Sequence, residues 1–277
     1  MATRAEAPLV APGNAERDVA LAVLLGALSL LAWGALWAWS ASPYARYAEH
    51  ASWLDSSAFA ALCRALPAGA LVGPAVLYAL AWVLMIAAMM LPTTYPVLGI
   101  FRVSTRSRAD GGRLLALVLA GFFSAWFLFG LLAHALDGAV AWLGGLNGWL
   151  LEHGWVAGAL VLAGAGLFQF SALKYRCLEQ CRTPFAFVAS RWRGSSPARE
   201  AFGIGLDHGV FCVGCCWALM LCMFVVGTGS LGWMLALGAL MAVEKNLPGG
   251  AKLKTPIGLG LLGAAGLIAL EHAWPAG

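Results

Sequence analysis

The chain has 277 residues, of which 61% are hydrophobic and only 11% are charged, whereas a typical soluble domain is about 45–50% apolar and about 25% charged. A single soluble core of this length cannot hide so much apolar surface, so the composition excludes a water-soluble enzyme, a nucleic-acid-binding protein and a disordered chain. The formal net charge of +4 then indicates cationic residues gathered in cytoplasmic loops rather than a nucleic-acid partner.

Seven apolar stretches are long enough, or nearly so, to predict membrane helices, which need about 20 residues. In chain order they cover 19–39, 74–101, 114–136, 155–173, 206–227, 231–243 and 256–270. The first is longer than the apolar part of a signal peptide, so we expect an uncleaved anchor. The second contains Pro92 and Pro96, which should kink or end it. The last two are short.

The distribution of positive charge predicts how the spans are oriented. With the N-terminus in the cytoplasm, all but two of the 17 Lys and Arg fall in cytoplasmic segments, and only Arg46 and Arg64 lie outside. The predicted fold is therefore an all-α polytopic bundle of about seven spans, with the N-terminus inside and the C-terminus outside. Residues 1–73 form an anchor span and an outer loop, and residues 74–277 form a six-span metal-binding membrane domain.

Six of the seven cysteines lie between residues 177 and 222. Cys177 and Cys181 have the i, i+4 spacing that places two thiols on one face of a helix. His208, Cys212 and Cys215 follow at i, i+4 and i+7, with Cys216 beside them. Both groups fall at the same predicted depth, near the cytoplasmic surface. We therefore expect them to converge on one site, whereas Cys63 and Cys222 are expected to be packing residues.

Softer candidate ligands lie at the same depth in other spans. Met89 and Met90 precede Pro92, and Glu244 ends the sixth stretch. Thiolate, thioether and imidazole groups together suit a soft or borderline ion, copper first and zinc second. The candidate metal ligands are Cys177, Cys181, His208, Cys212, Cys215, Cys216, Met89, Met90 and Glu244. The methionines are weaker ligands on this hypothesis, and Glu244 accepts the protons that thiols release on metal binding.

Four motifs give the sequence a family resemblance. They are Met89-Met90-x-Pro92-x-x-x-Pro96, Cys177-x-x-x-Cys181-Arg182-x-Pro184, Gly203-x-x-x-Asp207-His208-Gly209-x-x-Cys212-x-Gly214-Cys215-Cys216-Trp217-x-Leu219-Met220 and Glu244-Lys245. This set resembles the bacterial family of predicted metal-binding integral membrane proteins, also known as domain of unknown function 2182. The resemblance covers roughly residues 75 to 270. It implies membrane residence and metal binding, but neither a reaction nor a particular metal.

Three functions are compatible with these residues. The leading hypothesis is a multi-pass protein of the bacterial cytoplasmic membrane that transfers or transports a soft ion, with the lipid bilayer, the metal ion and a metal-donor or acceptor protein as partners. The second is a membrane thiol–disulfide oxidoreductase that uses Cys212 and Cys215, although the predicted topology places both on the reducing side. The third is an assembly subunit in which the metal only locks helices together. Whether the protein is an enzyme stays open.

Overall fold

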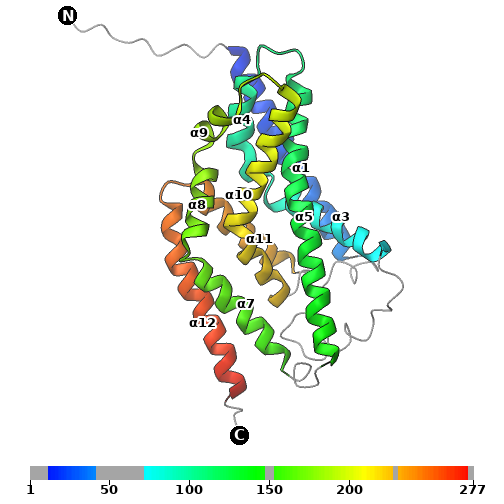
Figure 1. Ribbon diagram of the computed structural model, residues 1–277, viewed down its shortest axis with the longest axis vertical. Helices are drawn as coiled ribbons and strands as arrows, with labels where there is room; N and C mark the ends of the chain where they lie inside the picture. The colour runs from blue at the N-terminus through cyan, green and yellow to red at the C-terminus, as the bar shows by residue number, and fades with distance from the viewer. Residues whose placement is uncertain (1–11, 42–71, 147–152, 227–229, 274–277) are drawn as a thin grey trace, which may run out of the picture.

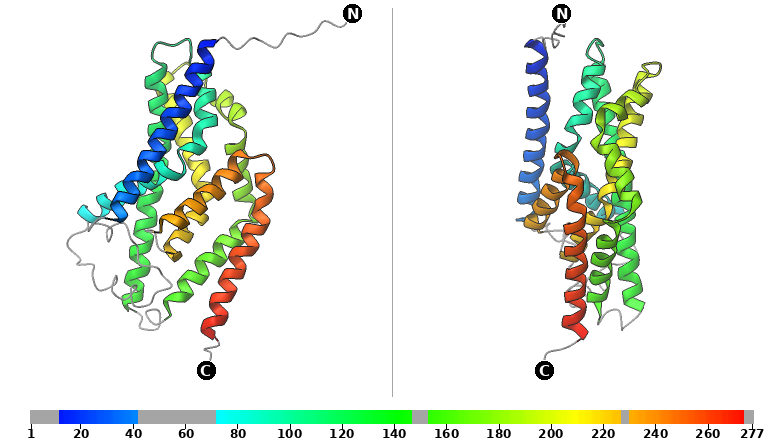
Figure 2. Two further views of the ribbon diagram at one scale, coloured as in Figure 1. Left: turned by 180° about the vertical axis from the view of Figure 1, so that it is seen from behind. Right: turned by 90° about the vertical axis from the view of Figure 1, so that its left-hand side faces the viewer.

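The computed structural model describes residues 12–41, 72–146, 153–226 and 230–273, and these residues are helical with short connections and no strand. The helices run down and up the long axis of the molecule (Figure 1). In chain order they are α1 (Pro12–Ser40), α3 (Val72–Met89), η2 (Pro92–Thr94), α4 (Tyr95–Ser104), α5 (Gly111–Leu146), α7 (Gly154–Phe168), α8 (Ala172–Arg182), α9 (Pro184–Arg191), α10 (Pro197–Val226), α11 (Leu231–Asn246), η3 (Gly250–Leu253) and α12 (Lys254–Ala273). The N-terminal end of α1 and the C-terminal end of α12 lie at opposite ends of that axis (Figure 2).

Helices α5 and α10 pack closely along their length because glycines line their contact. A Cβ atom added to Gly205 would lie only 1.9 Å from the carbonyl oxygen of Val118, and one added to Gly121 would lie 2.2 Å from that of Phe202. Gly209 approaches the backbone of Phe122 in the same way. Small residues allow membrane helices this close approach, so α10 is held at a defined distance from α5.

Two of the expected spans are broken helices rather than continuous ones. The stretch 74–101 breaks at Pro92, as the prolines predict, and its two parts meet at 55°. The stretch 155–173 breaks between α7 and α8 at an angle of 63°. Ser171 caps the start of α8 there. Its side chain accepts a hydrogen bond of 3.1 Å from the backbone N–H of Lys174, as is typical of an N-cap. The second break turns α8, with its two cysteines, toward α10.

The apolar helices support a membrane protein, and the number of seven spans stays a prediction. Four of the described helices are long and apolar enough to cross a membrane, and the two bent pairs raise the number to six if each is one span. Helix α11 has only 16 residues, which is short for a crossing. The outer loop with Cys63 lies outside the described residues, and the orientation of the termini stays a prediction.

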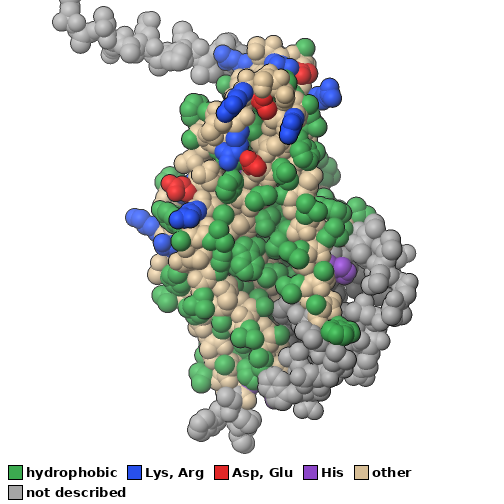
Figure 3. Space-filling model, viewed as in Figure 1, with side chains coloured by type: hydrophobic (Ala, Val, Ile, Leu, Met, Phe, Trp, Pro, Cys, Tyr) green, Lys and Arg blue, Asp and Glu red, His purple; other side chains and the backbone are tan. Residues whose placement is uncertain are grey.

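Charged side chains are unevenly distributed over the surface. Lys and Arg gather over the end where α5 and α10 begin and around the start of α12, and hydrophobic side chains cover much of the remaining face (Figure 3). This separation is typical of a protein with an apolar belt and a basic end. The largest buried cluster of the core contains Trp82, Ile86, Trp126 and most of the cysteines.

Candidate functional site

The two cysteine groups meet where α8 crosses α10. All five thiols, from Cys177, Cys181, Cys212, Cys215 and Cys216, are buried. Cys181 in α8 and Cys215 in α10 belong to the same buried cluster. Cys177, one turn earlier in α8, packs onto Gly214, where an added Cβ would lie 2.6 Å from its Sγ atom. Because Gly214 has no side chain, it leaves the space that the Cys177 side chain occupies.

Within α10 the thiols form a continuous group. The Sγ atoms of Cys215 and Cys216 are 3.3 Å apart, and Cys212 lies about one helical turn before Cys216. The thiol of Cys215 lies 3.2 Å from the carbonyl oxygen of Cys212 and donates to it. We call Cys181, Cys212, Cys215 and Cys216 the sulfur cluster, and Cys177 borders it.

A buried ammonium group contacts the sulfur cluster from α11. The Nζ atom of Lys245 donates to the Sγ of Cys212 at 2.8 Å and to the Sδ of Met90 at 3.6 Å. Met90 is fully buried at the break after α3, which explains why its thioether reaches the cluster. Its neighbour Met89 instead lies against Gly238 of α11, at 3.4 Å from a Cβ added there. Three helices, α8, α10 and α11, and the turn after α3 thus contribute groups to this point.

Glu244 faces a different partner from Lys245. Both of its carboxylate oxygens accept hydrogen bonds of 2.9 Å from the ammonium of Lys174, and both side chains are 2% exposed. Lys174 also donates to Oε1 of Gln169. Arg182 donates to the carbonyl oxygens of Glu244 and Leu247. This network joins α8 to the C-terminal end of α11.

His208 packs between aromatic rings one helical turn from the sulfur cluster. It is buried one turn before Cys212, stacked on Phe122 with ring centroids 5.7 Å apart and edge-on to Phe187 at 5.6 Å. Its Nδ1 atom has no hydrogen-bond partner in the structure. The predicted common face with Cys212 and Cys215 exists along α10, but α5 and α9 supply rings that enclose the imidazole.

The described side chains are not arranged around a metal-sized space. Among residues 12–41, 72–146, 153–226 and 230–273, no group of three or more His, Cys, Asp or Glu stands ready to hold a metal ion. The Cys215 thiol contacts that of Cys216, and the Cys212 thiol accepts from Lys245. The donor set is nevertheless soft, with four thiols and one thioether, so its chemistry fits a soft ion once side chains rotate.

Sequence reasoning found the cysteines but missed the two lysines that accompany them. Lys174 reads as part of a basic cytoplasmic loop, and Lys245 reads as half of an interfacial pair with Glu244. A signal for Lys174 was present, because Lys174, Cys177 and Cys181 are spaced i, i+3 and i+7 and so share one face of α8. For Lys245 the sequence offers no such signal, because its partners Met90 and Cys212 lie far away in the sequence, in the turn after α3 and in α10.

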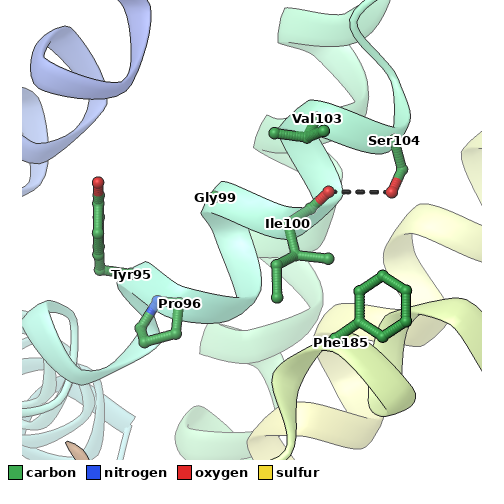
Figure 4. Close-up of a pocket in the computed structure, with 7 residues that line it drawn as sticks. All are labelled: Tyr95, Pro96, Gly99, Ile100, Val103, Ser104 and Phe185. Carbon is green, nitrogen blue, oxygen red and sulfur yellow. Dashed lines mark hydrogen bonds between the residues drawn. The ribbon is translucent and has the colours of Figure 1, made fainter. Parts of the chain in front are cut away.

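A groove of about 380 Å³ lies between α4 and α9, apart from the sulfur cluster. Tyr95, Pro96, Ile100 and Val103 line one side and Phe185 the other (Figure 4). Its lining residues carry apolar and hydroxyl groups and include no thiol, imidazole or carboxylate. The groove therefore lacks the chemistry of a site for a soft ion.

Comparison with known proteins gives one match. The model of the family PpoB2, described as copper chaperone, matches residues 79–268. That range contains every candidate ligand named above, together with Lys174 and Lys245. No curated protein and no solved structure matches the chain.

Proposed function

Since the chain belongs to the copper chaperone family PpoB2, we propose that it is a membrane-resident copper chaperone whose sulfur cluster carries Cu(I). The observation that carries the proposal is the convergence of buried thiols from α8 and α10 on one point, with the thioether of Met90 beside them. Thiolate and thioether ligands select Cu(I). The family also favours copper over zinc, the second ion that the sequence suggested.

The proposed ligands differ in how directly the structure supports them. Cys181, Cys212, Cys215 and Cys216 belong to one buried cluster and are the proposed thiolate ligands, with Met90 as a weak one. Cys177 borders the group and becomes a ligand if it moves off Gly214. His208 and Met89 are more remote, and reach copper only after rearrangement.

Glu244 takes a positioning role in this proposal. Its carboxylate is engaged by Lys174 on both oxygens, so it is poorly placed to accept protons from thiols or to bind copper. It instead anchors the end of α11 to α8, and Lys245 is the next residue. The pair of residues thereby sets where the Lys245 ammonium lies relative to Cys212.

The description of the family as copper chaperone favours a carrier that exchanges its cargo over a structural site, which holds its ion permanently. The copper chaperone family and the basic end of the molecule support exchange at the cytoplasmic face of a bacterial inner membrane, with a metal-donor or acceptor protein as partner. The thiol–disulfide alternative gains no support, since the Cys215 thiol is directed at the Cys212 carbonyl rather than the Cys212 thiol.

The test is copper binding by the full chain, purified in detergent under anaerobic reducing conditions and titrated with Cu(I) against a chromophoric chelator. We expect near-stoichiometric binding by the wild type and its loss in the double variant Cys212→Ser, Cys215→Ser. Cys222→Ser is the matched control, because Cys222 is equally buried but donates to the Ala218 carbonyl oxygen in a separate part of the core. A wild-type protein that takes up no Cu(I), or a double variant that binds as tightly, contradicts the proposal.

A further inference from the structure

Helix α3 ends at a break that frees a backbone carbonyl. In a continuous helix the N–H of residue 92 would donate to the carbonyl oxygen of Ala88, but Pro92 has no N–H. The backbone N–H groups of Met90 and Leu91 both donate to the carbonyl oxygen of Ile86 instead. In apolar surroundings a freed carbonyl needs a donor from a neighbouring helix or a hydroxyl side chain. The break after α3 therefore depends on groups from outside the helix.

The donors to this carbonyl come from α1. The hydroxyl of Ser29 donates to the Ala88 carbonyl oxygen at 2.8 Å, and the indole Nε1–H of Trp33 donates to the same oxygen at 3.2 Å. Ser29 and Trp33 are spaced i, i+4 and so share one face of α1. Leu36, on the next turn, belongs to the same buried cluster as Met90. Helix α1 therefore supplies the hydrogen bonds that the proline cannot make.

The same break carries one of the proposed copper ligands. Met90 lies two residues after Ala88, and its Sδ atom lies 3.6 Å from the Nζ atom of Lys245, which also donates to Cys212. On the other side of the break, Thr93 donates to the carbonyl oxygen of Met90 from both its backbone N–H and its hydroxyl. Hydrogen bonds thus hold the backbone before and after Met90, and this sets where its thioether lies.

We propose that Ser29 and Trp33 of α1 are positioning residues of the copper site, which hold the Met90 thioether beside the sulfur cluster. The proposal rests on the function proposed above and adds a helix to its site. Both residues contact a backbone oxygen rather than the metal, so they act only through Met90. The family match begins at residue 79, after α1 ends. The site therefore takes this contribution from a helix that the sequence predicts to be an anchor.

The experiment is a double-mutant cycle on the Cu(I) affinity of the full chain, measured in detergent by competition with a chelator. Ser29→Ala with Trp33→Phe removes both donors and should weaken Cu(I) binding about tenfold, the lower end of what loss of a supporting contact costs. Met90→Leu alone should weaken binding by a similar factor. In the Met90→Leu background the α1 substitutions should cause no further loss, because the thioether that they position is already absent.

The same helix offers matched controls. Trp37→Phe changes an indole that is 66% exposed, and Ser40→Ala removes a hydroxyl that donates to the Trp37 carbonyl oxygen within its own helix. Together these two changes should leave the Cu(I) affinity unchanged. X-ray absorption at the copper edge should show fewer sulfur ligands in Ser29→Ala with Trp33→Phe than in the wild type, a change that a loss of stability alone does not produce.

The outcomes separate this proposal from the proposed function. If the α1 double variant does not accumulate as folded protein, Ser29→Ala alone should show a loss that also disappears in the Met90→Leu background. An unchanged Cu(I) affinity of the α1 variant, or a further loss in the Met90→Leu background, overturns the proposal. A Met90→Leu variant that binds Cu(I) as tightly as the wild type overturns it as well and leaves the proposed function standing. A wild type that binds no Cu(I) overturns the proposed function.

Discussion

Two buried lysines lie close to the same sulfur cluster, and their charges are balanced in different ways. Lys174 contacts a carboxylate at 2.9 Å from both oxygens, whereas Lys245 contacts a thiol at 2.8 Å and a thioether at 3.6 Å. A carboxylate is a permanent counter-charge, so the first lysine holds helices together. In the proposed function the thiol beside the second lysine is a copper ligand, so the surroundings of that lysine would change with the cargo.

The largest effect is expected from breaking the structural pair. Lys174→Met leaves the Glu244 carboxylate buried without a partner, and losing one member of such a pair destabilises a protein by about 3–5 kcal/mol. The double variant Lys174→Met, Glu244→Met removes both charges and should recover most of that loss. Thermal unfolding of the detergent-purified protein measures both effects.

Copper binding by the double variant sharpens the comparison. Because the pair is structural in this view, the folded double variant should still bind Cu(I). A double variant that is as stable as the wild type but binds no copper would make Glu244 or Lys174 part of the copper site.

A second prediction concerns the contact that brings α8 onto α10. Gly214→Ala places a methyl group 2.6 Å from the present position of Cys177 Sγ, and overpacking of this kind costs about 1–3 kcal/mol. Gly203→Ala in the same helix meets nothing within 4 Å and should be neutral or stabilising, since alanine is the better helix former. Unfolding temperatures measured for both variants, together with alkylation of Cys177 in Gly214→Ala, check the prediction. Equal unfolding temperatures of the two variants would show that the Cys177 side chain moves aside with no loss of stability.

A third prediction uses two neighbouring methionines. Met90→Leu removes the thioether that accepts from Lys245, while Met89→Leu changes a side chain packed on Gly238. Both are volume-conserving changes that cost less than about 1.5 kcal/mol of stability. Only Met90→Leu should weaken Cu(I) binding, by about tenfold, the lower end of what loss of a supporting contact costs. Competition with a chelator measures the Cu(I) affinity of both variants, and equal affinities would exclude Met90 from the site.

Local spacing predicted the parts of this site that lie on one helix. The i, i+4 pair Cys177 and Cys181 shares a face of α8, and His208, Cys212 and Cys215 share a side of α10. The two groups meet at the contact of Cys177 with Gly214, whereas the membrane depth from which we expected this stays a prediction. The sequence does not reveal which neighbours fill the space between elements, so the aromatic rings around His208 were unforeseen. Adjacent helical residues point about 100° apart, and for this reason Glu244 and Lys245 serve different partners.

The helix breaks also show that the local sequence predicts only what local residues determine. Pro92 predicts the bend after α3, because proline lacks a backbone N–H and clashes with the preceding turn of a helix. The bend between α7 and α8 has no proline. It depends on the Ser171 cap, on the hydrogen bond from Lys174 to Gln169, and on the ion pair of Lys174 with Glu244 of α11. A bend held by tertiary contacts cannot be predicted from the local sequence. The sequence therefore predicted the break in the stretch 74–101 and missed the one in the stretch 155–173.

The smallest effect is expected where the same chemistry is exposed to water. Arg108 and Asp110 pair at 2.9 and 3.1 Å in the loop before α5. The hydrogen bond from Arg108 lowers the pKa of Asp110 below its ordinary value. A lowered carboxyl pKa means that the pair contributes at neutral pH, and that the contribution is lost as the pH falls through the folded-state pKa. Because water screens exposed pairs, Asp110→Asn should leave the unfolding temperature at neutral pH almost unchanged. Arg108→Ala should raise the Asp110 pKa in an NMR titration. A loss of stability in Asp110→Asn as large as that in Lys174→Met would show that burial is not what distinguishes these pairs.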